Sequence, residues 1–270
     1  STLMRSSAAS DVYKRQLDES KKTSHGILIY DFDDNLTTQF INDCLIPFRQ
    51  SYISDESLER NISELGTMTS RKDEIEVVLP TLPQLKSGDF GEILSYAITS
   101  HIHPETNLRP LKWRWKEHRD SPCHLTDIVL LCCDDYNNPQ TSDFLVAVES
   151  KNGATKPSGV ASRINDAIEG AAKDVNSRFS KTIAYLMAKY KNECDFESVK
   201  MARRFSDCIT VPFGKHFKAI AIVDKDHLTI HVNNISNSLL VKYPQIEVYA
   251  VPMKGLKSIY ESIYSNIPNT

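Results

Sequence analysis

The stretch that decides the fold is FLVAVESK, residues 144–151, in which five apolar residues precede an acidic, a small and a basic residue. A continuous apolar run of this length predicts a β-strand buried on both faces. Because successive side chains of a strand point to opposite faces, Glu149 and Lys151 share one face and Ser150 points to the other. The pattern predicts a charged pair at the end of a buried strand; the alternative is an exposed ion pair.

A second apolar strand precedes this one. Residues 128–133 read IVLLCC, which predicts a central strand covered on both faces, and Asp127 stands at its head. The turn-rich residues 134–143, DDYNNPQTSD, join the two strands. A short hairpin would bring Asp127 beside Glu149. Alternatively, Asp127 only caps the start of its strand.

Farther upstream, the pattern predicts a helix and another strand. Apolar residues within 90–102 follow the helical period and place Glu92 in the first turns. Glu92 could reach the other two carboxylates, or it could be a first-turn acid favoured by the helix dipole. Residues 111–116, LKWRWK, alternate strictly and predict a half-buried strand with both tryptophans facing the core. Its solvent face would carry Lys112, Arg114 and Lys116.

The remaining residues complete an α/β pattern. The N-terminal section predicts a strand at 26–31, a helix at 36–52 and one or two helices in 54–80. After the decisive strand we expect helices at 159–178 and 181–205, strands near 216–224, 228–232 and 246–251, and a last helix at 254–264. This order predicts an α/β (α+β) protein with a mixed central sheet flanked by helices.

Composition excludes several classes of protein. The chain has 270 residues, of which 40% are hydrophobic and 25% charged, as in ordinary globular proteins. Its longest apolar run, residues 128–133, is far shorter than the roughly 20 residues of a membrane span. Six cysteines without a CxxC pair, and no secretory signal, lead us to expect a cytoplasmic protein. No Walker-type loop is present, so the chain itself is not expected to bind ATP.

Charge is distributed unevenly although the net charge is only −3. Residues 120–150 contain six acidic side chains and no basic one, and they lie between two stretches of net positive charge, 109–119 and 151–218. An acidic cluster between basic stretches is typical of a metal site inside a phosphate-binding groove. Taken alone, the asymmetry fits ordinary fluctuation of charge equally well.

The chemistry follows from the predicted meeting of carboxylates. Two carboxylates that lie close together repel each other unless a cation is bound between them. Oxygen ligands of this kind favour Mg²⁺ or Mn²⁺ over zinc. The ammonium of Lys151 could orient or deprotonate a water, or neutralise charge on a phosphorane-like transition state, and a lysine pKa can be tuned toward neutrality. These groups together suit phosphodiester hydrolysis.

This arrangement resembles the PD-(D/E)xK nuclease superfamily, whose common core is α-β-β-β-α-β. The matching residues are Glu92, Asp127 and Glu149-Ser150-Lys151. The resemblance implies that Glu92, Asp127, Glu149 and Lys151 are catalytic. It also implies that Mg²⁺ or Mn²⁺ is held by Asp127, Glu149, the backbone carbonyl of Ser150, and Glu92. The proline that often precedes the aspartate is absent, because Thr126 stands there.

A narrower resemblance rests on three segments: GDFGEILSYAI at 88–98, TDIVLL at 126–131 and FLVAVESKNG at 144–153. With an N-terminal section of about 85 residues, they are similar to the HamA family, the nuclease subunits of the Hachiman anti-phage defence system. The similarity covers roughly residues 25–265. It implies DNA as the substrate, cleavage without sequence specificity, and a superfamily 2 helicase (HamB-like) as protein partner.

The predicted domain organisation has three parts. Residues 1–16 are polar and patternless and are interpreted as a non-native disordered leader. Residues 17–85 are acidic and are interpreted as an accessory or regulatory region, and residues 86–270 as the nuclease domain. Five basic side chains could contact the DNA backbone or could simply lie on solvated faces: Lys112, Arg114, Lys116, Arg163 and Lys173.

The sequence therefore favours a metal-dependent DNA endonuclease that acts as a defence effector with a helicase partner. One alternative is a stand-alone restriction or repair nuclease, although the acidic residues 17–85 are poorly suited to reading DNA. Another is a catalytically inactive nuclease fold that serves only as an adaptor. The presence of Asp127, Glu149 and Lys151 argues against the adaptor.

Overall fold

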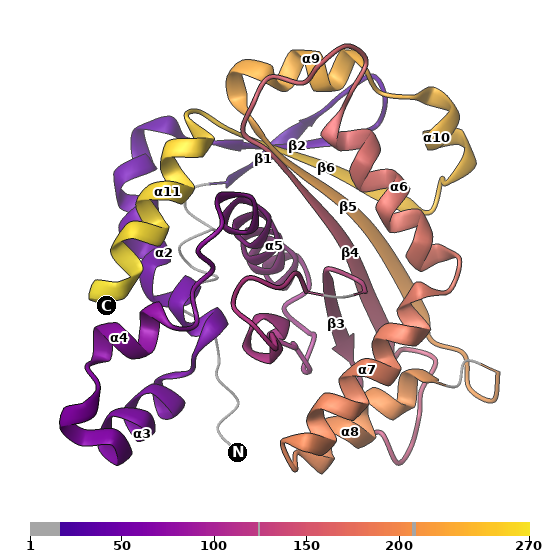
Figure 1. Ribbon diagram of the computed structural model, residues 1–270. Coiled ribbons are helices and arrows are strands. Elements are labelled where there is room, and N and C mark those ends of the chain that lie inside the picture. Colours follow the sequence, from indigo (N-terminus) through magenta and orange to yellow (C-terminus); the bar gives the residue numbers. More distant parts are fainter. Residues whose placement is uncertain (1–16, 124, 207–208) are drawn as a thin grey trace.

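A mixed β-sheet lies between two layers of helices in the computed structural model of the chain (Figure 1). The structure describes residues 17–123, 125–206 and 209–270. The predicted leader, residues 1–16, lies outside the described residues. The predicted fold class, a mixed sheet flanked by helices, is confirmed.

The sheet has six strands in the order β1-β2-β6-β5-β4-β3. The pairs β1–β2 and β3–β4 are antiparallel, whereas β4–β5, β5–β6 and β2–β6 are parallel. The N-terminal section therefore contributes strands to the same sheet as the C-terminal strand β6. The strands are β1 (Leu17–Lys22), β2 (Leu28–Phe32), β3 (Ile128–Cys132), β4 (Phe144–Gly153), β5 (Gly214–Asp224) and β6 (Ile246–Met253).

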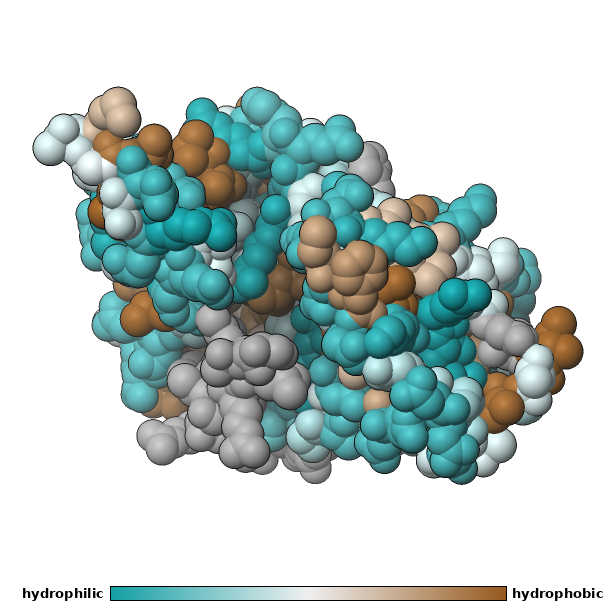
Figure 2. Space-filling model, turned by 90° about the horizontal axis from the view of Figure 1, so that it is seen from below, coloured by the Kyte–Doolittle hydropathy of each residue, from teal (hydrophilic) through white to brown (hydrophobic). Residues whose placement is uncertain are grey.

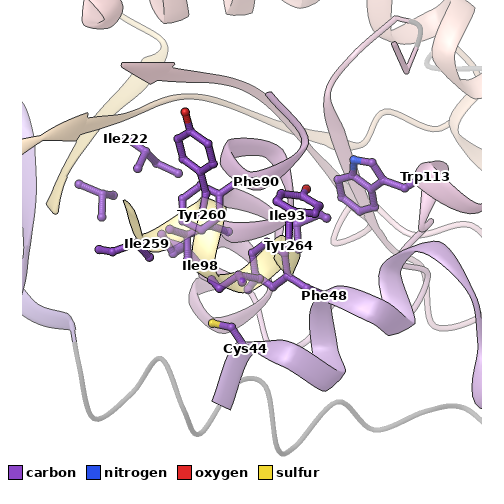
Figure 3. Close-up of a cluster of buried hydrophobic side chains, with 14 of the residues drawn as sticks. Cys44, Phe48, Phe90, Ile93, Ile98, Trp113, Ile222, Ile259, Tyr260 and Tyr264 are labelled. Carbon is purple, nitrogen blue, oxygen red and sulfur yellow. The ribbon is translucent and has the colours of Figure 1, made fainter. Parts of the chain in front are cut away.

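One face of the sheet is covered by α5 (Pro83–Ile102), which packs against α11 (Leu256–Asn266), with α2 (Thr37–Tyr52) outside them. Figure 3 shows how aromatic side chains from these three helices meet. Phe90 of α5 stacks on Phe48 of α2 with ring centroids 5.5 Å apart, and Tyr260 of α11 lies 5.9 Å from Phe90. This shared core holds the helix that carries Glu92.

The other face is covered by α6 (Arg163–Val175), which packs on β4, β5 and β6. Apart from Asp174, its buried residues are isoleucine, alanine and glycine, which lets the helix lie close to the strands. The chain then continues into α7 (Arg178–Asn192) and α8 (Phe196–Arg203). The other helices of four or more residues are α3 (Asp55–Leu65), α4 (Arg71–Glu76), η3 (Lys112–Trp115), α9 (Leu228–Asn233) and α10 (Asn237–Lys242).

The predicted strand at 111–116 is wrong, because these residues form the 3₁₀ helix η3, with Arg114 N–H donating to Leu111 C=O at 3.1 Å. In a strand both tryptophans would face one side. Here Trp113 packs against Tyr96 in the core around α5, whereas Trp115 packs against Tyr190 of α7. The two rings fill different cores, and the 3₁₀ turn between them allows each ring to reach its own core.

Two further predictions are corrected. Residues 228–232, predicted as a strand, form α9. Asp224 at the end of β5 accepts a hydrogen bond from Asp226 N–H, which starts a helical turn at 225–227 that leads directly into α9. The strand β3 is covered on both faces as predicted, yet it is the last strand of the sheet rather than a central one. Beyond it, an isolated bridge between Leu108 and Leu131 replaces the first strand of the expected α-β-β-β-α-β core in the part of the chain that the structure describes.

The surface seen from below is mainly hydrophilic, with hydrophobic residues in separate patches (Figure 2). Among the residues that the structure describes, no helix is both long and apolar enough to cross a membrane.

Candidate active site

The end of β4 positions two of the predicted residues. Glu149 is buried and faces α6, together with Lys151, whose side chain is 34% exposed. Ser150 points to the opposite face, where its hydroxyl is 2.8 Å from that of Ser95 on α5. The alternation predicted from FLVAVESK is present, and the partly exposed side chain of Lys151 places this part of the site next to solvent.

The β3–β4 hairpin brings Asp127 to the same place. Asp127 Oδ2 accepts a hydrogen bond of 2.9 Å from the backbone N–H of Ser150. Lys151 Nζ lies 2.5 Å from Glu149 Oε1 and 4.0 Å from Asp127 Oδ2. The three predicted side chains therefore converge on one point at the rim of the sheet.

Glu92 of α5 approaches this point from the other side of the sheet. Its Oε2 atom is buried and has no hydrogen-bond partner. Burial, and next the charge of Asp127, raise the pKa of Glu92 well above its usual range. Burial and the charge of Glu149 raise the pKa of Asp127 to about 6. Burial is the largest cause of both shifts, and the nearby cations Lys151 and Lys112 only partly offset it.

Lys151 is held as a cation in this arrangement. Burial lowers the pKa of Lys151, but Asp127 and Glu149 outweigh burial, so the pKa is raised above its usual value. The idea that the site tunes this lysine toward neutrality is not supported by these contacts. Orienting a water or neutralising charge fits the ammonium better than deprotonating a water does.

Three residues of α6 and α7 belong to the candidate site and were missed in the sequence. Arg178 Nη2 donates to Glu149 Oε2 at 2.6 Å and also bonds Asp174. Gly170 of α6 leaves the room that the carboxylate occupies, because a Cβ there would lie 2.3 Å from Glu149 Cδ. A glycine inside the predicted helix was the one signal available; nothing in the sequence distinguishes Asp174 and Arg178 from other charged helix residues.

The residues present fit a divalent cation in their chemistry. Asp127, Glu149 and the unpartnered oxygen of Glu92 supply carboxylate oxygens, which Mg²⁺ and Mn²⁺ prefer. The Ser150 N–H faces Asp127, and the C=O of a strand residue points to the same side as its N–H, so the carbonyl of Ser150 faces this edge too. Among the described residues, however, no three His, Cys, Asp or Glu side chains are grouped so that they could hold a metal ion. Both oxygens of Glu149 accept bonds from Lys151 and Arg178 instead.

The predicted DNA-contacting residues divide into two groups. Lys112 is buried and donates to the Thr126 carbonyl, and Lys116 is buried against Asp89, 2.5 Å away. Both also line a small pocket with Trp115, Tyr185 and Lys189. The exposed members of the predicted set are Arg114, which bonds the Gln50 carbonyl, Arg163, which pairs with Asp166, and Lys173.

Asp89 is the centre of a buried polar cluster that links the N-terminal helix α2 to α5. Its Oδ2 atom accepts hydrogen bonds from Lys116 Nζ and from the hydroxyl of Tyr52, the latter at 2.7 Å. Tyr52 also contacts the hydroxyl of Tyr264 on α11 at 2.7 Å. Burial raises the pKa of Asp89 although Lys116 opposes that shift. Because Asp89 lies one turn before Glu92, the cluster fixes the segment of α5 that enters the site.

Comparison with known proteins adds one finding. A family model described as HamA matches residues 8–267. The matched range includes the N-terminal section as well as Glu92, Asp127, Glu149 and Lys151, and it begins inside the predicted leader. No curated protein matches the chain.

Proposed function

Because the chain belongs to the HamA family, we propose that it is a metal-dependent deoxyribonuclease acting as the effector of a Hachiman anti-phage defence system. Family membership itself associates the chain with Hachiman antiviral defence. Nuclease chemistry, the metal and the partner are the proposal. The convergence of Asp127, Glu149 and Lys151 at one rim of the sheet is the observation that carries it.

The metal would be Mg²⁺ or Mn²⁺. Asp127, Glu149, the backbone carbonyl of Ser150 and Glu92 are the groups that would hold it. When bound, such an ion supplies Lewis-acid stabilisation of phosphoryl oxygens and a more acidic water. The unpartnered buried oxygen of Glu92 supports a cation here, because a buried polar atom without a partner is costly.

The protein's own groups would hold the substrate and the acidic side chains in place. The Ser150 N–H fixes the carboxylate of Asp127, and the end of β4 fixes Glu149 beside it. Lys151 is the partly exposed cation of the site, so its ammonium is suited to contact the scissile phosphate and to stabilise charge that develops there. Exposed Arg114, Arg163 and Lys173 could contact flanking phosphates.

DNA is the proposed substrate and a superfamily 2 helicase the proposed partner. The sequence contains no Walker-type phosphate loop, and a helicase would supply ATP-driven movement along DNA. The acidic section 54–76 offers a surface that repels DNA and suits contact with a protein.

The test is cleavage of plasmid DNA by the full-length chain with Mg²⁺ or Mn²⁺, alone and with the helicase encoded beside it. Glu149→Gln and Lys151→Met are each expected to lower the cleavage rate by roughly 10²–10³-fold or more. Lys254→Met, an exposed site far along the chain, serves as the matched control and is expected to keep the wild-type rate.

Two results would redirect the proposal. DNA binding without cleavage, at every metal concentration and with the helicase present, would contradict it and favour an adaptor. Full cleavage by the chain alone, with no effect of any helicase, would favour a stand-alone nuclease.

A further inference from the structure

A series of polar contacts through residues outside the motif connects Glu149 to the segment that carries Asp127. Arg178 donates to Glu149 Oε2 at 2.6 Å, and its Nε donates to Asp174 Oδ1 at 3.0 Å. Asp174 in turn accepts a hydrogen bond from the hydroxyl of Thr126, the residue directly before Asp127. Since the Ser150 N–H binds Asp127, these contacts close a ring around the site.

The ring is anchored in the core and not on the surface. Asp174 is 1% exposed, and Thr126 and Thr182 are fully buried. Thr182 of α7 holds Thr126 twice, through the Thr126 N–H at 3.2 Å and through the hydroxyl at 2.7 Å. A buried aspartate that already accepts two partners keeps its arginine in place, because releasing the guanidinium would leave the carboxylate charge uncompensated.

The local backbone explains how Arg178 reaches its position. α6 ends at Val175 and α7 begins at Arg178, and Ser177 between them adopts φ +116°, an unusual conformation for a residue with a side chain. This tight corner turns the first residue of α7 back over the end of α6. Strained backbone of this kind persists where surrounding contacts over-determine it, as the Arg178–Asp174 pair does here.

We propose that Arg178 and Asp174 are positioning residues of the nuclease site. Arg178 occupies Oε2 of Glu149 and leaves Oε1 to Lys151, while Asp174 orients both Arg178 and Thr126. The inference rests on the proposed function, because it concerns the side chains that would hold the divalent ion. Partners that orient metal ligands from behind usually change metal affinity or activity by 10–100-fold when they are removed.

The experiment measures equilibrium binding of Mn²⁺ to the full-length protein by calorimetry, beside DNA cleavage and thermal unfolding. Arg178→Gln is expected to weaken Mn²⁺ binding by about 10–100-fold and to shift the Mn²⁺ concentration needed for cleavage upward by a similar factor. Arg178→Lys keeps the charge but cannot span both carboxylates, so its loss is expected to be smaller. Arg203→Gln, an exposed arginine on α8, is the matched control and should bind Mn²⁺ as the wild type does.

The outcomes separate the two ideas. If Arg178→Gln is folded and binds Mn²⁺ like the wild type while Glu149→Gln does not, the positioning role is wrong and the nuclease proposal stands. If the wild type binds no Mn²⁺ and cleaves no DNA, both are overturned. Should Arg178→Gln fail to fold, Arg178→Lys and Asp174→Asn decide: wild-type Mn²⁺ affinity in both would overturn the positioning role, and weakened affinity in folded protein supports it.

Discussion

Gly170 of α6 lies directly against the carboxylate of Glu149 on β4, so closely that a Cβ at position 170 would fall 2.3 Å from Glu149 Cδ. Glycine is ordinarily unfavourable inside a helix by up to about 1 kcal/mol relative to alanine. The helix tolerates it here because the acidic side chain needs the space. The close approach of α6 to β4 therefore limits the positions that the Glu149 carboxylate can take.

Replacing this glycine is expected to be damaging although it improves helix propensity. Gly170→Ala should push the Glu149 carboxylate away, lowering the free energy of unfolding by about 1–3 kcal/mol and DNA cleavage by roughly 10–100-fold. Urea unfolding and plasmid cleavage measure the two effects. Gly88→Ala on α5 is the matched control, because nothing lies within 4 Å of its added Cβ, and it should be neutral or stabilising. Equal effects at both positions would contradict this.

Divalent ions should stabilise the folded protein. At 100 times the dissociation constant, binding to the folded state alone adds about 2.7 kcal/mol, which for a chain of this size corresponds to a rise in Tm of roughly 5–10 °C. Thermal unfolding with Mg²⁺ or Mn²⁺, against the same protein in chelator, measures the shift. Glu149→Gln should abolish it. A rise of the same size in that variant would place the ion elsewhere.

Removal of Lys116 should destabilise the fold because the Lys116–Asp89 pair is buried, with both side chains 4% exposed. Lys116→Ala leaves Asp89 without its cation and is expected to cost about 3–5 kcal/mol of unfolding free energy. Lys257→Ala, which breaks an exposed pair with Glu261, should cost less than about 1 kcal/mol. Urea unfolding of both variants tests the contrast, and similar losses would show that burial is not the deciding factor.

Asp120 gives the protein a pH-dependent contribution to stability. It accepts hydrogen bonds from the Thr81 hydroxyl and from the backbone N–H groups of Thr81 and Leu82 beside the start of α5. These bonds, led by that of the Thr81 hydroxyl, lower the pKa of Asp120 from 3.8 to about 2. A carboxyl group whose pKa is lower in the folded than in the unfolded state stabilises the folded protein at pH values above the unfolded-state pKa. This stabilisation is lost as the pH falls through the folded-state pKa.

Asp120→Asn should therefore be less stable than the wild type at pH 7, and the difference should shrink between about pH 4 and pH 2. Urea titrations of both proteins across this range measure it. Since other carboxyls titrate there too, the difference between the two proteins is the relevant quantity. A difference that stays constant with pH would argue against the charge of Asp120.

Much of the site could be predicted because β4 carries its information locally. Five apolar residues define a buried strand, and the alternation of a strand then fixes the side on which Glu149 and Lys151 lie. The hairpin to Asp127 follows from a short turn-rich connection. These are patterns of a few neighbouring residues, in which propensity and burial agree.

The misses arose where distant contacts decide. LKWRWK has the alternation of a strand, yet Trp113 and Trp115 are drawn into different cores, and only the tertiary structure shows this. Asp174 and Arg178 are four residues apart, the spacing of an ordinary surface pair on a helix, and nothing in the sequence shows that the helix breaks between them. Their importance comes from Glu149 and Thr126, which lie far away along the chain.

The pairing of β2 with β6 has a practical consequence. Leu28 and Ile29 lie beside Tyr249 and Ala250, so a fragment beginning at residue 86 would strip β6 of its neighbour and uncover the apolar sides of α5 and α11. Bare strand edges invite pairing with other chains. We therefore expect the truncated protein to self-associate. Individual substitutions on the surfaces of α3 and α4 are a better test of what the first 85 residues do.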